Sequence, residues 1–197
     1  NLILLAIAPV FIIMLYIYYK DKYEKEPKRL LIYNFILGAV VSIIITTLLY
    51  YVSDILMPLT NHTSIFQQFI KAFFVVGLIE EFSKYVIVRY NAQTNKAFNE
   101  PFDGIVYAVM VSMGFAATEN IFYVLESGYQ TGILRAFTAI PAHATFGVLM
   151  GYYMGKAKFS NNKVVLNLTG LFLAVIFHGA YDFFLFIDFV PGIWVGA

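Results

Sequence analysis

The chain has 197 residues, of which 60% are hydrophobic and 13% are charged, and its formal net charge is +1. Soluble globular domains carry about 25% charged residues, so this composition, with a mean hydropathy of +0.75, excludes that class and indicates a protein embedded in a lipid bilayer. The basic residues lie in short connections rather than in one patch, so nothing indicates a nucleic-acid partner. The sequence has no cysteine, which excludes disulfides and thiol catalysis.

The apolar stretches of the chain are long enough to cross a bilayer, which takes about 20 residues of helix. They predict six helices, over about 2–19, 30–52, 65–90, 104–126, 133–155 and 164–188. All connections are short, so we expect a single all-α domain over residues 1–197, a polytopic transmembrane helix bundle. The sequence is still apolar at 192–197, which leaves room for a further helix in the native chain.

Basic residues alternate between successive connections. Lysine and arginine gather in 20–29, 89–96 and 156–163, whereas 53–64 and 127–132 contain neither residue. Connections that face the cytoplasm are enriched in these residues, so both termini of this chain are predicted to be extracytoplasmic. Tyr50 and other tyrosines near the helix ends are typical of the aromatic belts at a membrane interface.

The third predicted helix carries Glu80, Glu81 and Lys84 at bilayer depth. A charged side chain at the centre of a bilayer costs about 2.5–3.5 kcal/mol, so retained charges indicate function. Lys84 lies four residues after Glu80 and three after Glu81, and can neutralise one carboxylate while the other holds or loses a proton. A salt bridge that only locks helix packing explains one glutamate, but not a second that points about 100° around the helix.

The fourth predicted helix carries Glu119 followed by Asn120, with Asp103 just before its start. Glu119 has no basic neighbour on its own helix, so it must be protonated, bound to a metal or partnered from another helix. A neutral glutamate hydrogen-bonded across helices accounts for it as well as a catalytic role does. Asp103 is interpreted as a helix N-cap without a chemical role.

The fifth predicted helix begins a face of small residues with a histidine. His143, Gly147, Gly151 and Gly155 follow one another at intervals of four residues. Such faces let membrane helices approach closely, so His143 is expected on a tightly packed seam rather than toward lipid. A packing role and a chemical role for His143 are equally good explanations when this residue is taken alone.

The last predicted helix places His178 four residues before Asp182. A carboxylate bonded to one ring nitrogen would fix the tautomer and orientation of the imidazole, although a purely structural hydrogen bond gives the same spacing. At about 1.5 Å per residue, the polar residues of these four helices fall between the middle and the outer half of the bilayer, so one shared site is expected. Other polar residues fall near helix ends and are interpreted as interfacial: Asp54, His62, Lys71, Arg135 and Asp188.

Several stretches of the chain match the motifs of a known family. They are EEFSK at 80–84, FDGIVYAVMVSMGFAATEN at 102–120, HATFGVLMGYYMGKAKFS at 143–160 and FHGAYDF at 177–183, with KDKYEKEP at 20–27. Together they resemble the PrsW family of bacterial intramembrane proteases, which is related to the CAAX-processing and bacteriocin-processing (CPBP) membrane proteases. The resemblance covers nearly the whole chain.

This resemblance implies a CPBP-like helical core in a bacterial cell membrane. It also implies hydrolysis of a peptide bond in a single-pass membrane protein, as in the first cut of a membrane-anchored anti-sigma factor. The paired glutamates of the superfamily correspond to Glu80 and Glu81, and its final His-x-x-x-Asn or Asp motif corresponds to His178 and Asp182. Glu119 stands where the wider superfamily has a histidine, a change typical of PrsW-like members.

Peptide hydrolysis needs a base for water, a group that stabilises the oxyanion and a proton donor for the leaving amine. We assign the base to Glu80 or Glu81, tuned by burial and by Lys84, and the other two tasks to His178 oriented by Asp182. Glu119 and His143 would complete the catalytic set, with Lys84 and Asn120 in support.

No cofactor is favoured by the sequence, but a zinc site is an alternative. The chain has no HExxH sequence, so Zn²⁺ would depend on convergence of side chains from several helices: Glu80, Glu81, Glu119, His143 and His178. Two further classes of function stay open. One is a non-catalytic membrane scaffold subunit. The other is a proton- or cation-coupled transporter, against which the lack of an internal repeat argues.

Overall fold

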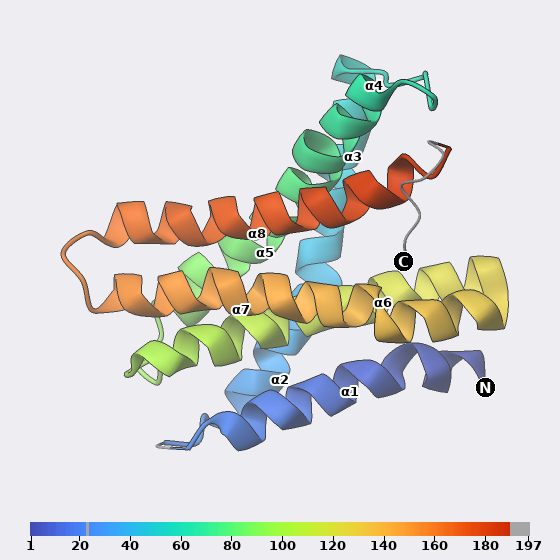
Figure 1. Cartoon of the computed structure of the whole chain (residues 1–197). Helices are drawn as coiled ribbons and strands as arrows, with labels where there is room; N and C mark the ends of the chain where they lie inside the picture. The colour runs from blue at the N-terminus through green and yellow to red at the C-terminus, as the bar shows by residue number, and fades with distance from the viewer. Residues whose placement is uncertain (23, 190–197) are drawn as a thin grey trace.

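The computed structural model describes residues 1–22 and 24–189 (Figure 1). The described residues are helical with no strand, which confirms the predicted all-α membrane bundle. The expectation of a further helix after 192–197 concerns residues outside the described ranges. In chain order the elements are α1 (Leu2–Lys20), α2 (Lys28–Ile36), η1 (Leu37–Ser42), α3 (Ile43–Leu56), α4 (Ile65–Ile70), η2 (Lys71–Gly77), α5 (Leu78–Ile87), η3 (Val88–Ala92), α6 (Pro101–Phe137), α7 (Ala139–Lys158) and α8 (Lys163–Phe186).

Element α6 is two helices joined by a reversal at Gly128. This glycine has φ 82° and ψ −161°, a conformation that residues with a Cβ rarely adopt. The Nη2 atom of Arg135 lies 2.5 Å from Oε2 of Glu119, although the two residues are 16 apart in sequence. A straight helix would separate them by about 24 Å, so the chain must turn back. Figure 1 shows this reversal in yellow, at the right-hand end of α6.

Within the described residues, four helical segments are long and apolar enough to cross a membrane: Leu2–Lys20, Lys28–Leu56, Pro101–Lys158 and Lys163–Phe186. The third contains the reversal at Gly128 and therefore supplies two of the predicted helices. The remaining predicted helix, α4 to η3, carries Glu80, Glu81 and Lys84 near its middle, so it is too charged to stand out by composition.

The first half of α6 is the centre of the bundle. It packs against α1, α2, η1 and α7, and most residues from 103 to 117 are buried. Figure 1 shows α6 and α7 between α1 below and α8 above. The predicted glycine seam on α7 is confirmed, because a Cβ on Gly151 would lie only 2.3 Å from the carbonyl oxygen of Gly104 on α6. Close backbone contact here fixes how α7 carries His143 past α6.

The basic connections lie together at one end of the bundle. In Figure 1, residues 24–27, 93–100 and 159–162 are at the left, the N-terminus and the reversal of α6 are at the right, and the connection between α3 and α4 is at the top. This sorting agrees with the alternation of basic and base-free connections along the sequence.

The glycine seam gives the first prediction. Gly151→Leu should destabilise the protein by about 1–3 kcal/mol or prevent its folding, because the added side chain forces α6 and α7 apart. Thermal unfolding of purified protein in detergent measures the effect. The matched control is Tyr152→Leu, since Tyr152 is 46% exposed on the outer face of the same helix. Equal stability of the two variants would mean that the seam tolerates a side chain.

Candidate functional site

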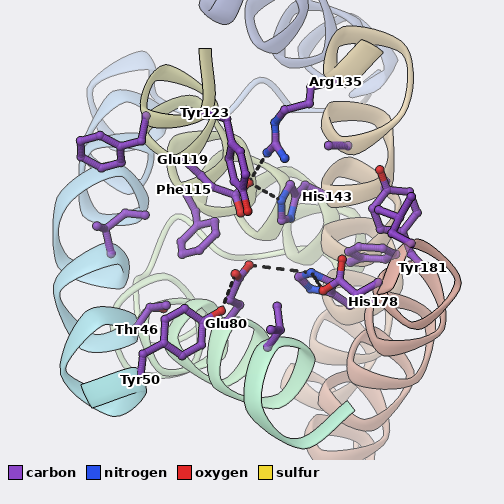
Figure 2. Close-up of a pocket in the computed structure, with 18 of the residues that line it drawn as sticks. Thr46, Tyr50, Glu80, Phe115, Glu119, Tyr123, Arg135, His143, His178 and Tyr181 are labelled. Carbon is purple, nitrogen blue, oxygen red and sulfur yellow. Dashed lines mark hydrogen bonds and ion pairs between the residues drawn. The ribbon is translucent and has the colours of Figure 1, made fainter. Parts of the chain in front are cut away.

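A cavity of about 500 Å³ opens between α3, α5, α6, α7 and α8 (Figure 2). Five of the six residues predicted to be catalytic line it: Glu80, Glu119, His143, His178 and Asp182. The four polar helices therefore converge on one site, as the sequence predicts. Aromatic side chains form much of the remaining wall, among them Phe115, Phe146 and Tyr181.

The sixth predicted residue, Glu81, lies behind the cavity wall and is fully buried. Its Oε1 atom accepts hydrogen bonds from Nζ of Lys84 at 2.7 Å and from Nδ1 of His178 at 2.8 Å. Lys84 lies on the same face of α5 because the two residues are three apart. Glu81 thus holds the ammonium group of Lys84 and the imidazole of His178 in place.

Glu80 points into the cavity itself, as Figure 2 shows. Its Oε1 atom accepts a hydrogen bond from the hydroxyl of Tyr50 at 2.7 Å. Its Oε2 atom is 3.7 Å from Nζ of Lys84 and has no hydrogen-bond partner in the described part of the chain. Oε2 of Glu81 also lacks a partner among these residues, but only Glu80 lines the cavity, so Glu80 is the one of the pair that presents an oxygen to a reactant.

His143 connects Lys84 on α5 to Glu119 on α6. Nζ of Lys84 lies 3.2 Å from Nδ1 of His143, and Nε2 of His143 lies 3.0 Å from Oε2 of Glu119. An ammonium can only donate, so Nδ1 is the acceptor and the Nε2–H group donates to Glu119. The contacts with Lys84 and Glu119 therefore fix both the ring orientation and the tautomer of His143.

Arg135 is the partner from outside its own helical turn that Glu119 needs to remain ionised. It donates to Glu119 at 2.5 Å and to Oδ1 of Asn120 at 2.7 Å, and its guanidinium stacks on the ring of Tyr123. The interpretation of Arg135 as merely interfacial is wrong, because the reversal at Gly128 folds it back over α6. Asn120 also donates to the carbonyl of Ala6 on α1, so it supports Arg135 from outside the cavity.

The predicted contact between His178 and Asp182 is present, because Oδ2 of Asp182 lies 3.3 Å from Nε2 of His178. A second and shorter contact also orients the ring, the hydrogen bond of 2.8 Å from Nδ1 to Glu81. Phe146 stacks on the same ring at 4.8 Å, so packing also holds Nε2 toward the cavity.

Three of the five predicted metal ligands come together. Glu80, His143 and His178 each offer one ligand atom within 4.8 Å of the others. One carboxylate and two imidazoles are a donor set that suits Zn²⁺, and Glu80 has an oxygen free to bind. The residues are of the right chemical types for a zinc ion, and His143 would bind one by giving up its contact with Lys84 or Glu119. Glu81 and Glu119 instead bond the side chains around this set.

Two side chains at the site were not predicted as site residues. Tyr50 was placed at the membrane interface, yet α3 brings its hydroxyl onto Glu80. Arg135 reaches Glu119 only through the reversal at Gly128. α3 supplies part of the cavity wall through Thr46 and Tyr50, although the sequence places no charged residue at bilayer depth on this predicted helix. The sequence signal for this was weak, since a tyrosine near a helix end is common in membrane proteins.

The fold and the cavity define a polytopic membrane protein with a polar, partly ionised site enclosed by helices. Residues 26–196 match the family described as "PrsW family intramembrane metalloprotease". The chain is similar to Protease PrsW of Oceanobacillus iheyensis, with 42% identity over 91% of this chain and 80% of the relative. It is also similar to Protease PrsW of Clostridioides difficile, with 37% identity over 96% of this chain and 81% of the relative. Protease PrsW of Bacillus subtilis is 36% identical over 91% of this chain and 80% of the relative.

No solved structure matches this chain. The family match covers most of the sequence, so the chain belongs to the PrsW family of intramembrane proteases. Membership supports a peptidase over the scaffold and transporter alternatives. It also agrees with the predicted membrane location.

The different surroundings of the paired glutamates give the second prediction. Glu81→Gln should lower the free energy of unfolding by about 3 kcal/mol or more, because it leaves the buried ammonium of Lys84 without its nearest counter-charge. Glu80→Gln should cost much less, since the amide can still accept from Tyr50 and lies in the cavity. Chemical or thermal unfolding of both variants tests this order. The reverse order would mean that Glu80, rather than Glu81, is the anchor of Lys84.

Proposed function

We propose that this chain is a single membrane protease domain that cuts a single-pass membrane protein in the extracytoplasmic half of the bilayer. The substrate would be of the membrane-anchored anti-sigma factor kind that the family resemblance implies. One observation carries the proposal: Glu80 presents a carboxylate oxygen without a hydrogen-bond partner to a cavity of about 500 Å³, beside two histidines.

Glu80 would act as the general base. Tyr50 holds one oxygen of its carboxylate, which leaves Oε2 to accept a proton from a water molecule in the cavity. As that proton leaves, the water oxygen forms its bond to the scissile carbonyl carbon, and negative charge develops on the carbonyl oxygen. Lys84, 3.7 Å from Oε2, limits the energetic cost of keeping this carboxylate ionised at bilayer depth.

His178 would serve the oxyanion and then the leaving amine. Its Nδ1 is committed to Glu81, so Nε2 faces the cavity, 3.8 Å from Oε2 of Glu80 and 3.3 Å from Asp182. A proton on Nε2 can stabilise the oxyanion and pass to the amine nitrogen as the carbon–nitrogen bond breaks. The proton that Glu80 took from water then returns to Nε2, which restores the site.

The other polar residues hold this geometry. His143, Glu119 and Arg135 form one wall through hydrogen bonds whose directions are fixed, so the cavity keeps its shape when substrate enters. Glu80, His143 and His178 would also be the residues that hold a zinc ion, which when bound supplies Lewis acidity toward the carbonyl and makes water more acidic.

The third prediction concerns activity. Purified enzyme, reconstituted with a single-pass anti-sigma factor substrate, should lose activity by orders of magnitude in Glu80→Gln, because the amide cannot accept the proton. The control Glu126→Gln changes an exposed glutamate on α6 and should remain active. Wild-type activity in Glu80→Gln would refute the assignment of the base.

Zinc content and chelator sensitivity of the same preparations separate two mechanisms. Activity that survives tight chelation supports Glu80 as a base acting alone. Loss of cleavage on chelation, with recovery on added Zn²⁺ and less bound zinc in His178→Ala, would replace that role with metal binding by the same three residues.

The fourth prediction concerns orientation. We propose that the basic end of the bundle is cytoplasmic and that both termini are extracytoplasmic, because basic connections stay inside. The sequence has no cysteine, so single cysteines can be introduced cleanly. Asn61→Cys should react with an impermeant thiol reagent in intact cells, whereas Asn161→Cys should react only after lysis. Both asparagines are exposed, Asn61 in the connection between α3 and α4 and Asn161 in the connection between α7 and α8. The opposite labelling would invert the proposed topology.

A further inference from the structure

The basic end of the bundle contains a second cluster of ionisable groups, away from the cavity. Its carboxylates come from the connection between α1 and α2 and from the start of α6: Asp21, Glu24, Glu26, Glu100 and Asp103. Asp21 and Asp103 have no exposed surface, and Glu26 is 3% exposed. Along α6, Asp103 is 16 residues before Glu119, or about 24 Å, so this cluster is separate from the proposed catalytic site.

Part of the cluster is satisfied by local hydrogen bonds. Oδ2 of Asp103 accepts from the backbone amides of Asn99 and Glu100 at 2.7 and 2.8 Å, as a capping carboxylate does. The hydroxyl of Tyr107 donates to Oε2 of Glu26. These bonds join the α1–α2 connection to the first turns of α6.

Several buried carboxylate oxygens in the cluster remain unsatisfied. Both oxygens of Asp21, Oδ1 of Asp103 and Oε1 of Glu100 have no hydrogen-bond partner among the described residues. Burial raises the pKa of Asp21, although the backbone amide of Glu26 and the ammonium group of Lys25 act to lower it. Unpaired carboxylate oxygens that are shielded from water are costly, so they point to a missing partner.

Among the described residues, the lysines near this cluster bond backbone carbonyls rather than its carboxylates. Lys25 donates to the backbone carbonyls of Tyr18 and Asp21, and Lys158 donates to the carbonyl of Asn95. Within the part of the chain that the structure describes, no ion pair joins a lysine or arginine to any carboxylate of the cluster. Burial, and then the neighbouring carboxylates of Asp103 and Asp21, raise the pKa of Glu26 to about 8 against the lowering effect of Tyr107.

We propose that Asp21 and one neighbouring carboxylate, Asp103 or Glu100, bind a hard divalent cation, Mg²⁺ or Ca²⁺, that clamps the α1–α2 connection to the start of α6. The donors are all oxygens, which suits these cations rather than zinc. Among the described residues, only the group of Glu80, His143 and His178 offers three ligand atoms within 4.8 Å of one another. One or two carboxylates and several waters therefore complete the shell, as Mg²⁺ commonly requires.

The position of the clamp explains what it would do. Asp103 lies in the first turn of α6 and is next to Gly104, whose backbone meets Gly151 of α7 in the glycine seam. A cation here would hold α1 and α6 together at the end of the bundle opposite the reversal at Gly128. It would stabilise the folded chain in proportion to the logarithm of its concentration above the dissociation constant, without touching the reacting groups.

The fifth prediction tests this clamp with Asp21→Asn. Full-length protein is stripped with chelator, and its Tm is then measured while MgCl₂ or CaCl₂ is titrated. Wild type should show a saturable rise in Tm. Asp21 makes no side-chain hydrogen bond among the described residues, so Asp21→Asn should keep the fold, and its Tm without cation should equal or exceed that of wild type. The variant should need at least about tenfold more Mg²⁺ or Ca²⁺ for the same rise.

Three controls make the outcome decisive. Glu126→Gln, an exposed carboxylate, and Glu80→Gln, in the cavity, should both keep the full response. Sodium chloride at matched ionic strength should not reproduce it. An equal response of wild type and Asp21→Asn, a response that sodium chloride reproduces, or no response in wild type would overturn the clamp. A response lost only in Glu80→Gln would move the cation to the cavity. None of these results depends on proteolytic activity.

Discussion

The polar site depends on the ammonium group of Lys84. This side chain is 1% exposed, and its Nζ lies 2.7 Å from Glu81, 3.7 Å from Glu80 and 3.2 Å from His143. Two adjacent glutamates without it would face a desolvation cost of several kcal/mol for each ionised group. Because Glu81 also holds His178, this one cation fixes the positions of both imidazoles around the cavity.

The three glutamates of the site differ in their hydrogen-bond partners. Glu81 and Glu119 each direct an oxygen to two hydrogen-bond donors, which are a cation and a histidine in both cases. Glu80 keeps one oxygen free in the cavity. A site with three equivalent glutamates would have no defined base, whereas here Glu81 lies off the cavity, Glu119 is bonded to Arg135 and His143, and Glu80 is left for a reactant. Chemistry at Glu80 therefore rests on the structural roles of its neighbours.

Patterns confined to one helix were predictable from the sequence, and contacts between helices were not. The pairing of Glu81 with Lys84 follows from helical spacing, and the seam at Gly151 follows from a four-residue repeat. The role of Arg135 depends on the backbone of Gly128, and sequence spacing alone suggested only a short connection there. Which glutamate faces the cavity depends on the rotation of α5, which is set by packing against α3 and α8.

The size of the cavity limits how a substrate could be bound under the proposed function. One turn of α-helix has a pitch of 5.4 Å and a diameter of about 10–12 Å with side chains, which is a volume of about 400–600 Å³. The cavity is of that order, so only about one turn of a substrate helix would meet Glu80 and His178 at a time. Within an intact helix, the backbone carbonyl of that turn is hydrogen-bonded to the amide four residues later. Local unwinding of the scissile segment would free this carbonyl for attack, as the proposed function requires.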